Sequence, residues 1–527
     1  MERLNYSKIS IVLDGFVAFV VLGGIELANG ATITVGPGAG CDFDTIQAGI
    51  DVASDGDTVL VASGEYVITE PITFRGKAIT VKSESGADET TIRMGTPTDI
   101  NRGSVVVFEN GEAIAAVLDG FTITGGRGSL VDSEEAWIWG GGILFNASSG
   151  IVRNCTIEQN SADHCGGGLC CVYDSSVAMN NCIISENSVT VESGGGVICW
   201  DNSSVTMTQC FINRNSAGNS GGGVFCGQIS SGTMTACIIS DNFATLSAGG
   251  VFCYKRSSLA MTDCIVKGNT ADHSCGGVKC HKDSSRATLT CCAIIGNTTQ
   301  KYGGGLVIGG GSATITNCVI ATNAAAEEEG GGLFCWNGSA TVTNSIFWGN
   351  TAPIGPGIWM GKTPTFIVSY SNVAGGKAGV DVQSDSTLTW GEGNIDTDPF
   401  FVRIGYWDDN GTRSPSDDVW VDGDYHLRSE AGRWNSDSQT WVQDDVTSPC
   451  IDAGDPMSAI GWESFPNGGF VNMGTYGGTS KASKSYFGEP TCETIVAGDI
   501  NGDGQVNRAD LEIMALHWTD DEPLPLP

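Results

Sequence analysis

The stretch GGGVFCGQISSGTMTACIISDNFATLSA, residues 221–248, recurs with variations through the middle of the chain. Each copy opens with glycines followed by an apolar residue, which stands at Ile143, Leu169, Val197, Val224, Val251, Val278, Leu306, Leu333 and Ile358. The eight steps from the first of these positions to the last give a period of about 27 residues. A period of this size predicts a solenoid, in which each repeat stacks on the one before it.

One repeat contains three short segments with the character of strands. In residues 221–248 these are 224–226, 233–235 and 237–239, separated by turns, and Asn242 closes the last turn before the next glycines. Three strands per repeat fit one triangular coil. The sequence therefore predicts an all-β fold, a right-handed parallel β-helix with about 27 residues per coil.

Columns of equivalent residues support this stacking. Neighbouring strands lie about 4.8 Å apart, so stacked coils place identical side chains above one another. An asparagine column can hydrogen-bond to itself because the amide both donates and accepts. That column is Asn160, Asn187, Asn215, Asn242, Asn269, Asn297, Asn323 and Asn350. We expect an apolar column to fill the interior: Met179, Met207, Met234, Met261, Leu289, Ile315 and Val342.

Thirteen of the 20 cysteines form two further columns. The first holds Cys155, Cys182, Cys210, Cys237, Cys264, Cys292, Cys318 and then Ser345; the second holds Cys171, Cys199, Cys226, Cys253, Cys280, Ile308 and Cys335. Because Ser345 and Ile308 replace cysteine, we interpret the column thiols as buried free filler that prefers a small apolar group. Disulfides are the alternative in an exported protein. The remaining seven can be bridged or exposed: Cys41, Cys165, Cys170, Cys275, Cys291, Cys450 and Cys492.

Two histidines lie beside cysteines in the repeats, His164 next to Cys165 and His273 near Cys275. They are four coils apart, about 19 Å at the strand spacing. They cannot share a zinc ion, whose ligands lie about 2 Å from the metal. We expect both histidines to lie at bends that face solvent.

The composition and the amino terminus indicate an exported protein. The net charge of −34 argues against nucleic acid as a partner, because such binding needs clustered cations. Arg3 and Lys8 precede the mostly apolar stretch 9–21, and Ala28-Asn29-Gly30 offers a cleavage site, so residues 1–30 are predicted to be a signal peptide. An uncleaved anchor is the alternative. No other stretch is long enough to span a bilayer, so we expect a secreted or cell-surface protein without a membrane span in the mature chain.

The strand after each glycine cluster predicts a binding face. If its first and third residues point inward, the second points outward, giving the column Leu144, Cys170, Ile198, Phe225, Phe252, Lys279, Val307, Phe334 and Trp359. Aromatic rings can stack on sugars, so the candidate substrate-binding residues are Trp200, Phe225, Phe252, Tyr254, Phe334, Trp336 and Trp359. Two alternatives stay open: loops cover this face, or the inward and outward phase is reversed.

A basic cluster supplies the candidates for catalysis. Lys279, His281, Lys282 and Asp283 stand together, and Lys255, Arg256, Lys267 and Arg286 are near them in the repeats. A polysaccharide lyase needs a base to remove a proton next to a carboxylate and a cation to stabilise the resulting charge. Solvated surface charge is the alternative interpretation. A glycosidase needs two carboxylates at a fixed separation, and no such pair stands out.

These features resemble known families. The stretch DTIQAGIDVASDGDTVLVASGEY, residues 44–66, looks like the amino-terminal cap of pectin-lyase-like right-handed β-helix proteins, and we expect a helix there that packs Ile46, Ile50 and Val52 on one side. The repeats resemble bacterial β-helix repeat proteins and the polymorphic outer-membrane proteins, so the resemblance covers residues 31–390. It implies the fold; the superfamily contains lyases, hydrolases and adhesins. The paired aspartates within coils, Gly-His-Gly and Arg-Ile-Lys signatures of polygalacturonases are absent.

Residues 391–488 look like the closing region of such exported proteins. The segments IDTDPFF, GDYHLRSE, SPCIDAGDP and NMGTYGG carry this resemblance. We expect the region to cap the last coil, whose edge would otherwise be free to pair with another chain. Five tryptophans are expected to pack it, with sugar binding as the alternative: Trp407, Trp420, Trp434, Trp441 and Trp462.

The last segment, residues 489–527, contains a calcium-loop motif. In GDINGDGQVNRADLEIMALHW, residues 498–518, the oxygen ligands of an EF-hand-like loop fall on Asp499, Asn501, Asp503, Gln505 (through its carbonyl), Asn507 and Asp510. Aspartate at the twelfth loop position resembles a dockerin repeat, which implies Ca²⁺ binding and a cohesin-like protein partner. Dockerins have two such repeats and this chain has one, so a calcium-stabilised helical tag is the alternative.

Together these features predict an exported β-helix protein that binds polysaccharide or a cell-surface glycan and attaches through its calcium-binding repeat. The alternative is a polysaccharide lyase or glycoside hydrolase. Long, regular coils without insertions favour the binding protein, because active sites usually lie on loops added to a scaffold.

Overall fold

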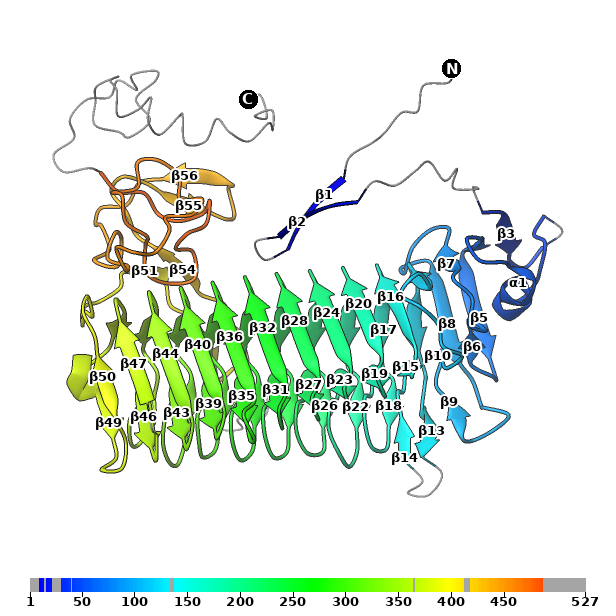
Figure 1. Cartoon of the computed structure of the whole chain (residues 1–527), viewed down its shortest axis with the longest axis horizontal. Coiled ribbons are helices and arrows are strands. Elements are labelled where there is room, and N and C mark those ends of the chain that lie inside the picture. The colour runs from blue at the N-terminus through cyan, green and yellow to red at the C-terminus, as the bar shows by residue number, and fades with distance from the viewer. Residues whose placement is uncertain are drawn as a thin grey trace, which may run out of the picture.

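The computed structural model describes residues 9–13, 16–20, 30–38, 40–132, 137–363, 365–411 and 418–486. Its main body is a parallel β-solenoid, whose strands stack along the long axis of the molecule (Figure 1). Val197, Val224 and Val251 are directly paired neighbours. This register of 27 residues confirms the predicted period.

Three long parallel sheets form the faces of the solenoid. Sheet 1 contains β6 (Ile72–Thr73), β10 (Val106–Phe108), β15 (Ile143–Asn146), β19 (Leu169–Val172), β23 (Val197–Trp200), β27 (Val224–Gly227), β31 (Val251–Tyr254), β35 (Val278–His281), β39 (Leu306–Gly309), β43 (Leu333–Trp336), β46 (Ile358–Gly361) and β49 (Val380–Val382).

Sheet 2 follows sheet 1 in each coil. It contains β3 (Thr32–Val35), β4 (Thr58–Val61), β7 (Thr80–Ser83), β11 (Val117–Asp119), β16 (Ser149–Arg153), β20 (Ser176–Asn180), β24 (Ser204–Thr208), β28 (Ser231–Thr235), β32 (Ser258–Thr262), β36 (Arg286–Thr290), β40 (Ser312–Thr316), β44 (Ser339–Thr343), β47 (Thr365–Ser369) and β50 (Leu388–Trp390).

Sheet 3 completes the triangle that the sequence predicts. It contains β5 (Gly64–Ile68), β8 (Thr90–Met94), β12 (Thr122–Thr124), β17 (Thr156–Glu158), β21 (Ile183–Ser185), β25 (Phe211–Asn213), β29 (Ile238–Ser240), β33 (Ile265–Lys267), β37 (Ala293–Ile295), β41 (Val319–Ala321), β45 (Ile346–Trp348) and β48 (Asn372–Val373).

The structure adds a fourth sheet of two-residue strands, which lies between sheet 3 and the next glycine cluster. It contains β18 (Ser161–Ala162), β22 (Ser188–Val189), β26 (Ser216–Ala217), β30 (Phe243–Ala244), β34 (Thr270–Ala271), β38 (Thr298–Thr299) and β42 (Ala324–Ala325). Two residues are too few to show an alternating pattern, so these strands were not expected from the sequence.

The predicted columns form the interior. The amide nitrogen of each column asparagine donates to the amide oxygen of the next, as from Asn215 to Asn242 at 3.0 Å and from Asn242 to Asn269 at 2.9 Å. The methionine column and both cysteine columns are buried in one continuous core. The column cysteines are free thiols, in agreement with the interpretation as filler.

The first cysteine column has a polar function that the filler interpretation missed. The thiol of Cys237 donates to the carbonyls of Met207 (3.5 Å) and Thr235 (3.4 Å). The hydroxyl of Ser345 makes the equivalent bond to Thr343 O at 2.9 Å. The position therefore prefers a small hydrogen-bond donor rather than a small apolar group.

The amino-terminal cap contains the helix α1 (Ile46–Val52). Thr45 caps it by accepting from the backbone N–H of Ala48 at 3.3 Å. Ile46 and Ile50 are buried as expected, whereas Val52 is 55% exposed and does not pack on that side. Residues of α1 contact β3, β4 and β6, so the helix closes the first coils.

An excursion interrupts the regular coils between β12 and β15. It contains β13 (Gly128–Asp132), which pairs antiparallel with β14 (Trp137–Trp139) and with β9 (Arg102–Gly103). The expectation of coils without insertions is therefore wrong at this point.

The strands of the carboxy-terminal region cover a flank of the solenoid. Among the described residues, these strands pair only with one another: β51 (Phe401–Arg403) with β54 (Asp424–Leu427), β52 (Tyr406–Asp408) with β53 (Val419–Val421), and β55 (Arg433–Asn435) with β56 (Thr440–Val442). Phe401, Tyr425 and Leu427 pack on the outer face of sheet 3, against Ile295, Val319 and Ile346 among others. Figure 1 shows β51, β54, β55 and β56 beside the last coils.

Polar contacts fix this flank interaction over several coils. Lys267 of β33 pairs with Asp422 at 2.5 Å, and Asn344 donates to Ser458 at 3.1 Å. The last coil contains the short 3₁₀ helix η1 (Gly376–Gly379). Its links to the first residues of the region include the bridge between Asn372 and Ile395 and hydrogen bonds from Asn372 to Thr397 O and from Gly375 N to Asp396. The region thus contacts the last coil through its first residues, whereas its strands pack on sheet 3, a contact that was not expected from the sequence.

Most of residues 1–30 and all of residues 487–527 lie outside the described residues, and so does the predicted calcium loop. Within the predicted signal peptide, β1 (Ile9–Leu13) pairs antiparallel with β2 (Phe16–Val20). In the part of the chain that the structure describes, no helix has both the length and the apolar character needed to cross a membrane.

Candidate functional site

The predicted phase of sheet 1 is correct. In β27, Val224 and Cys226 belong to the solenoid core, whereas Phe225 points outward and joins a separate apolar cluster. Phe225 is 4% and Phe252 6% exposed, so most of this column is buried although it faces outward. The segment before each glycine cluster packs beside these rings. The outer face of sheet 1 is therefore a groove with two walls, not an exposed stripe.

This aromatic groove has a volume of about 490 Å³ and runs across the strands from β14 to β35. Its floor is the outward column Ile198, Phe225, Phe252 and Lys279. One wall is Trp200, Tyr254 and His281, from the ends of the same strands. The opposite wall comes from the segments before the glycines: His164, Cys165, Glu192, Asn219, Leu246 and Ser247. Trp137 and Trp139 of the excursion close one end.

The rings of the groove are held by one another. Phe225 and Phe252 meet edge to face with centroids 5.1 Å apart, and the imidazole of His281 stacks on Tyr254 at 6.2 Å. Trp200 lies over Gly227 of the next coil, where a Cβ would come within 2.6 Å of the indole ring. Gly227 therefore leaves room for the indole to lie along the solenoid axis.

Lys279 is the buried cation of the groove. It is 9% exposed, and its ammonium donates to the hydroxyls of Ser247 (2.9 Å) and Ser274 (3.0 Å). The nitrogen also lies 5.5 Å from the centre of the Phe252 ring. Burial lowers the pKa of Lys279 to about 8.

The other catalytic candidates have different surroundings. Burial, together with the charge of Lys279, lowers the pKa of His281, which favours the neutral imidazole at pH 7. Lys282 and Asp283 are exposed on the turn after β35, and Lys282 lies 5.6 Å from the centre of the Tyr254 ring. The structure thus brings Lys279 and His281 into the groove and leaves Lys282 and Asp283 at its rim.

The wider basic cluster is dispersed over the faces of the solenoid. Lys267 lies on sheet 3, where it pairs with Asp422, and Arg286 begins β36 of sheet 2. Lys255 and Arg256 lie on the turn after β31. Neighbouring positions in the sequence point to different faces in each coil, so these side chains do not form one site.

Three of the predicted aromatic residues form a separate patch. Phe334 stacks on Trp359 with centroids 4.5 Å apart, and Lys362 lies 4.7 Å from the ring of Trp336. Trp336 is 40% exposed, whereas Trp359 is 5% exposed. This Trp336 patch lies three strand spacings beyond Tyr254, roughly 14 Å along the axis. The predicted stripe is therefore two sites, a groove and a patch.

Several residues of the groove were not predicted from the sequence. Trp137 and Trp139 directly precede the first glycine cluster, and this Trp-Ile-Trp signal could have indicated an aromatic edge strand. His164 is half-buried, and its Nδ1 accepts from Ile138 N at 3.3 Å, so it is not a solvent-facing bend residue; His273 is exposed as expected. Glu192 is the one carboxylate among the described residues that line the groove.

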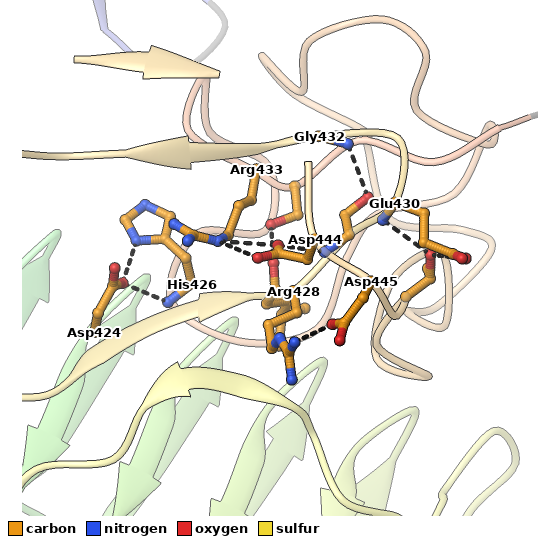
Figure 2. Close-up of polar contacts among 12 residues, drawn as sticks. Asp424, His426, Arg428, Glu430, Gly432, Arg433, Asp444 and Asp445 are labelled. Carbon is orange, nitrogen blue, oxygen red and sulfur yellow. Dashed lines mark hydrogen bonds and ion pairs between the residues drawn. The ribbon is translucent and has the colours of Figure 1, made fainter. Parts of the chain in front are cut away.

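A second polar cluster lies in the carboxy-terminal region (Figure 2). His426 is 1% exposed, its Nδ1 lies 2.6 Å from Asp424 Oδ1, and its ring stacks on Tyr476. Burial opposes ionisation of Asp424, but its bonds with His426 outweigh burial and lower the pKa of that carboxyl. The cavity beside Tyr476 has a volume of only about 10 Å³. We infer that this cluster holds the fold of the region and does not bind a ligand.

Two ion pairs complete that cluster. Nε of Arg433 lies 2.9 Å from Asp444 Oδ2 with both side chains 11% exposed, and Arg428 pairs with Asp445 (Figure 2). Trp407 and Trp420 meet edge to face over sheet 3, and Trp434 meets Trp441 across β55 and β56. Four of the five tryptophans thus pack the region as expected. Trp462 is 83% exposed and does not.

Among the residues that the structure describes, no group of three or more His, Cys, Asp or Glu side chains is placed to hold a metal ion. The predicted calcium ligands lie outside those residues, so the calcium prediction stands on its loop spacing alone.

Comparisons with known proteins agree with the β-helix fold. A family model described as "Right handed beta helix region" matches residues 23–218, 119–294 and 280–411. Among solved structures, pectate lyase Pel9A is 11% identical with a TM-score of 0.41 and covers 84% of this chain and 96% of its own. The GH87 α-1,3-glucanase from Streptomyces thermodiastaticus strain HF3-3 is 15% identical with a TM-score of 0.39 and covers 70% of each chain. A polygalacturonase from Erwinia carotovora ssp. carotovora is 12% identical with a TM-score of 0.31 and covers 69% of this chain and 96% of its own. No curated protein sequence matches the chain.

Proposed function

This chain belongs to the right-handed β-helix family, and we propose that the aromatic groove on its sheet 1 binds a glycan as an exported or cell-surface protein. The observation that carries the proposal is the composition of the groove. Three indoles and Tyr254 stand beside polar groups from Glu192, Asn219, Lys279 and His281 in about 490 Å³. Aromatic rings stack on the apolar faces of sugars, while side-chain dipoles and charges bond their hydroxyls.

The test is binding of the purified full chain to a glycan array, followed by affinity measurements on each hit. Trp200→Ala and Tyr254→Ala should each weaken binding tenfold or more, because each removes a ring from the groove wall. Trp336→Ala tests whether the separate patch extends the site. Trp462→Ala removes an exposed indole far from the groove and serves as the control. Unchanged affinity in both groove variants would refute the proposal.

Polysaccharide lyase activity is the second candidate function. The specific observation in its favour is that Lys279 and His281 place two nitrogen groups in the groove. The lowered pKa of His281 leaves a neutral imidazole that can accept a proton, and Lys279, with a pKa of about 8, can supply the cation near neutral pH. A glycoside hydrolase has less support, because its mechanism uses two carboxylates and Glu192 is the one carboxylate in the described lining. The absorbance of unsaturated products, measured on a panel of uronic polysaccharides, decides this candidate. No product from any polymer would remove it.

We also propose that residues 489–527 attach the protein through one calcium-loaded, dockerin-like repeat. The support is the spacing of Asp499, Asn501, Asp503, Gln505, Asn507 and Asp510. Calorimetric titration of the full chain with Ca²⁺ should give one site, which Asp499→Ala together with Asp503→Ala abolishes. A cohesin-like partner should bind only the calcium-loaded chain. Calcium binding without partner binding would leave the alternative of a calcium-stabilised helical tag.

A further inference from the structure

Lys279 occupies a position that its neighbours fill with apolar side chains. In the register of sheet 1 it lies between Phe252 of β31 and Val307 of β39. The solenoid therefore does not need an amine at this position for its own packing. The side chain is buried to 9% exposure, and it still lines the groove. A primary amine therefore lines the cavity at a floor that is otherwise apolar.

No opposite charge from the described part of the chain compensates this amine. Its bonding partners are the hydroxyl oxygens of Ser247 and Ser274, and Phe252 presents its ring. Cys275 is the nearby thiol, and burial raises its pKa to about 12, which keeps it neutral. Within the described residues no carboxylate forms an ion pair with Lys279, and Glu192 lies three strand spacings away, roughly 14 Å. Burial without a counter-charge lowers the pKa of Lys279 to about 8, so a larger fraction of this amine than of an exposed lysine is unprotonated near pH 7.5.

The geometry also suits a nucleophile. An unprotonated amine has two N–H groups, which the two serine oxygens can accept, and one lone pair. The lone pair is then left for an electrophile in the cavity. His281 follows two residues later on the same strand and shares the groove, so it can move protons there.

We propose that Lys279 captures carbonyl ligands reversibly as imines. The nitrogen lone pair attacks the carbonyl carbon and a C–N bond forms, while a proton passes from nitrogen to the former carbonyl oxygen. The resulting carbinolamine then loses water, which carries away that oxygen and the two amine hydrogens. No oxidant or reductant is needed. The ligand class is an aromatic aldehyde or ketone, or the carbonyl of an open-chain sugar, of a size that fits about 490 Å³.

Imine formation does not depend on the glycan binding proposed above, and its test measures a different quantity, the labelling of each lysine. The full chain is incubated at pH 7.5 with benzaldehyde or with glucose, and sodium cyanoborohydride traps any imine as a secondary amine. Peptide mass spectrometry then gives the occupancy of every lysine. We expect Lys279 to be labelled at least tenfold more than Lys282, an exposed lysine at the rim of the same groove. The two carbonyl compounds distinguish an aromatic source from an open-chain sugar.

Variants supply the controls. Lys279→Met should remove the dominant adduct, and Lys282→Met should retain it. The comparison between lysines within the unmodified chain needs no variant, so it stays valid if a substitution disturbs folding. Labelling that spreads over the exposed lysines, with Lys279 no more reactive than Lys282, would overturn the proposal for both carbonyl compounds.

Discussion

The two cysteine columns differ in whether a side chain must donate a hydrogen bond as well as have the right size. Ser345 can replace cysteine in the first column because its hydroxyl reaches the same type of carbonyl as the thiols do. Ile308 can replace cysteine in the second column, where the thiol bonds are longer, as from Cys280 to Ser312 O at 3.6 Å. The two columns therefore have different requirements, although the sequence shows both simply as cysteine.

This difference predicts the result of two substitutions at Cys237. Cys237→Ser keeps a donor for the carbonyls of Met207 and Thr235, whereas Cys237→Ala leaves those buried carbonyls without it. We expect the alanine variant to be less stable than the serine variant by about 1 kcal/mol. Denaturant unfolding of the two variants measures this. Equal stability, or a more stable alanine variant, would support the filler interpretation instead.

Lys279 gives a pH-dependent prediction. Folding lowers the pKa of Lys279 from 10.5 to about 8. Below pH 8 the buried charge therefore destabilises the folded state. Above about pH 10.5 the amine is neutral in both the folded and the unfolded state, and this destabilisation is absent. Lys279→Met should therefore be more stable than the unmodified chain at pH 7, by up to about 3 kcal/mol, and the difference should shrink as the pH rises from 8 to 10.5. Unfolding at several pH values checks this, with Lys282→Met as the exposed control.

At the scale of the strand, the sequence predicts direction better than exposure. The alternation in β27 and β31 correctly places Phe225 and Phe252 on the outer face of sheet 1. It cannot show that the chain before each glycine cluster folds beside them, because this depends on bends with positive φ, such as Gly194 and Gly221, rather than on any periodic pattern. For the same reason Trp137 and Trp139 were missed: their strand belongs to an excursion outside the repeat.

The loop around Glu463 in the carboxy-terminal region makes a second pH prediction. Glu463 is 7% exposed and accepts the N–H groups of Asn472 and Gly478, each at 2.8 Å. Burial outweighs these bonds and raises its pKa from 4.5 to about 7. The folded state therefore retains a proton that the unfolded chain loses between pH 4.5 and 7, so the contribution of Glu463 to stability falls as the pH rises through this range.

Glu463→Gln resembles the protonated form and should remove that dependence. At pH 8 the variant should be more stable than the unmodified chain, by up to about 3 kcal/mol, and at pH 4.5 the two should be nearly equal. Thermal unfolding followed by tryptophan fluorescence measures this, because Trp420, Trp434 and Trp441 lie in the same region. Glu84→Gln, at an exposed turn, is the control. A stability difference that does not change with pH would contradict the raised pKa of Glu463.

The whole molecule combines a part that the sequence predicts well with a part that it does not. The solenoid follows from a period, and each coil contacts only its neighbours, so local pattern determines it. The carboxy-terminal region has no period, and its place depends on Phe401, Tyr425 and Leu427 meeting sheet 3 residues more than 50 positions earlier in the chain. Such contacts leave no spacing in the sequence, which is why the packing of the region on sheet 3 was not predicted.

Because each coil contacts only its neighbours, we expect a destabilising substitution to affect only the nearby coils. Leu427→Ala removes a side chain that is 6% exposed at the flank interface and should cost about 2–5 kcal/mol there. Hydrogen exchange should then accelerate in β37, β41 and β45, which this region covers, while β10 and β15 remain protected because stability in a solenoid passes only between neighbouring coils. Leu118→Ala, which removes a fully buried side chain from β11, is the reciprocal control and should expose β7 and β16 without affecting β45. Equal acceleration along the whole solenoid in both variants would mean that it unfolds as one cooperative unit, and then the flank region would stabilise every coil rather than the few it contacts.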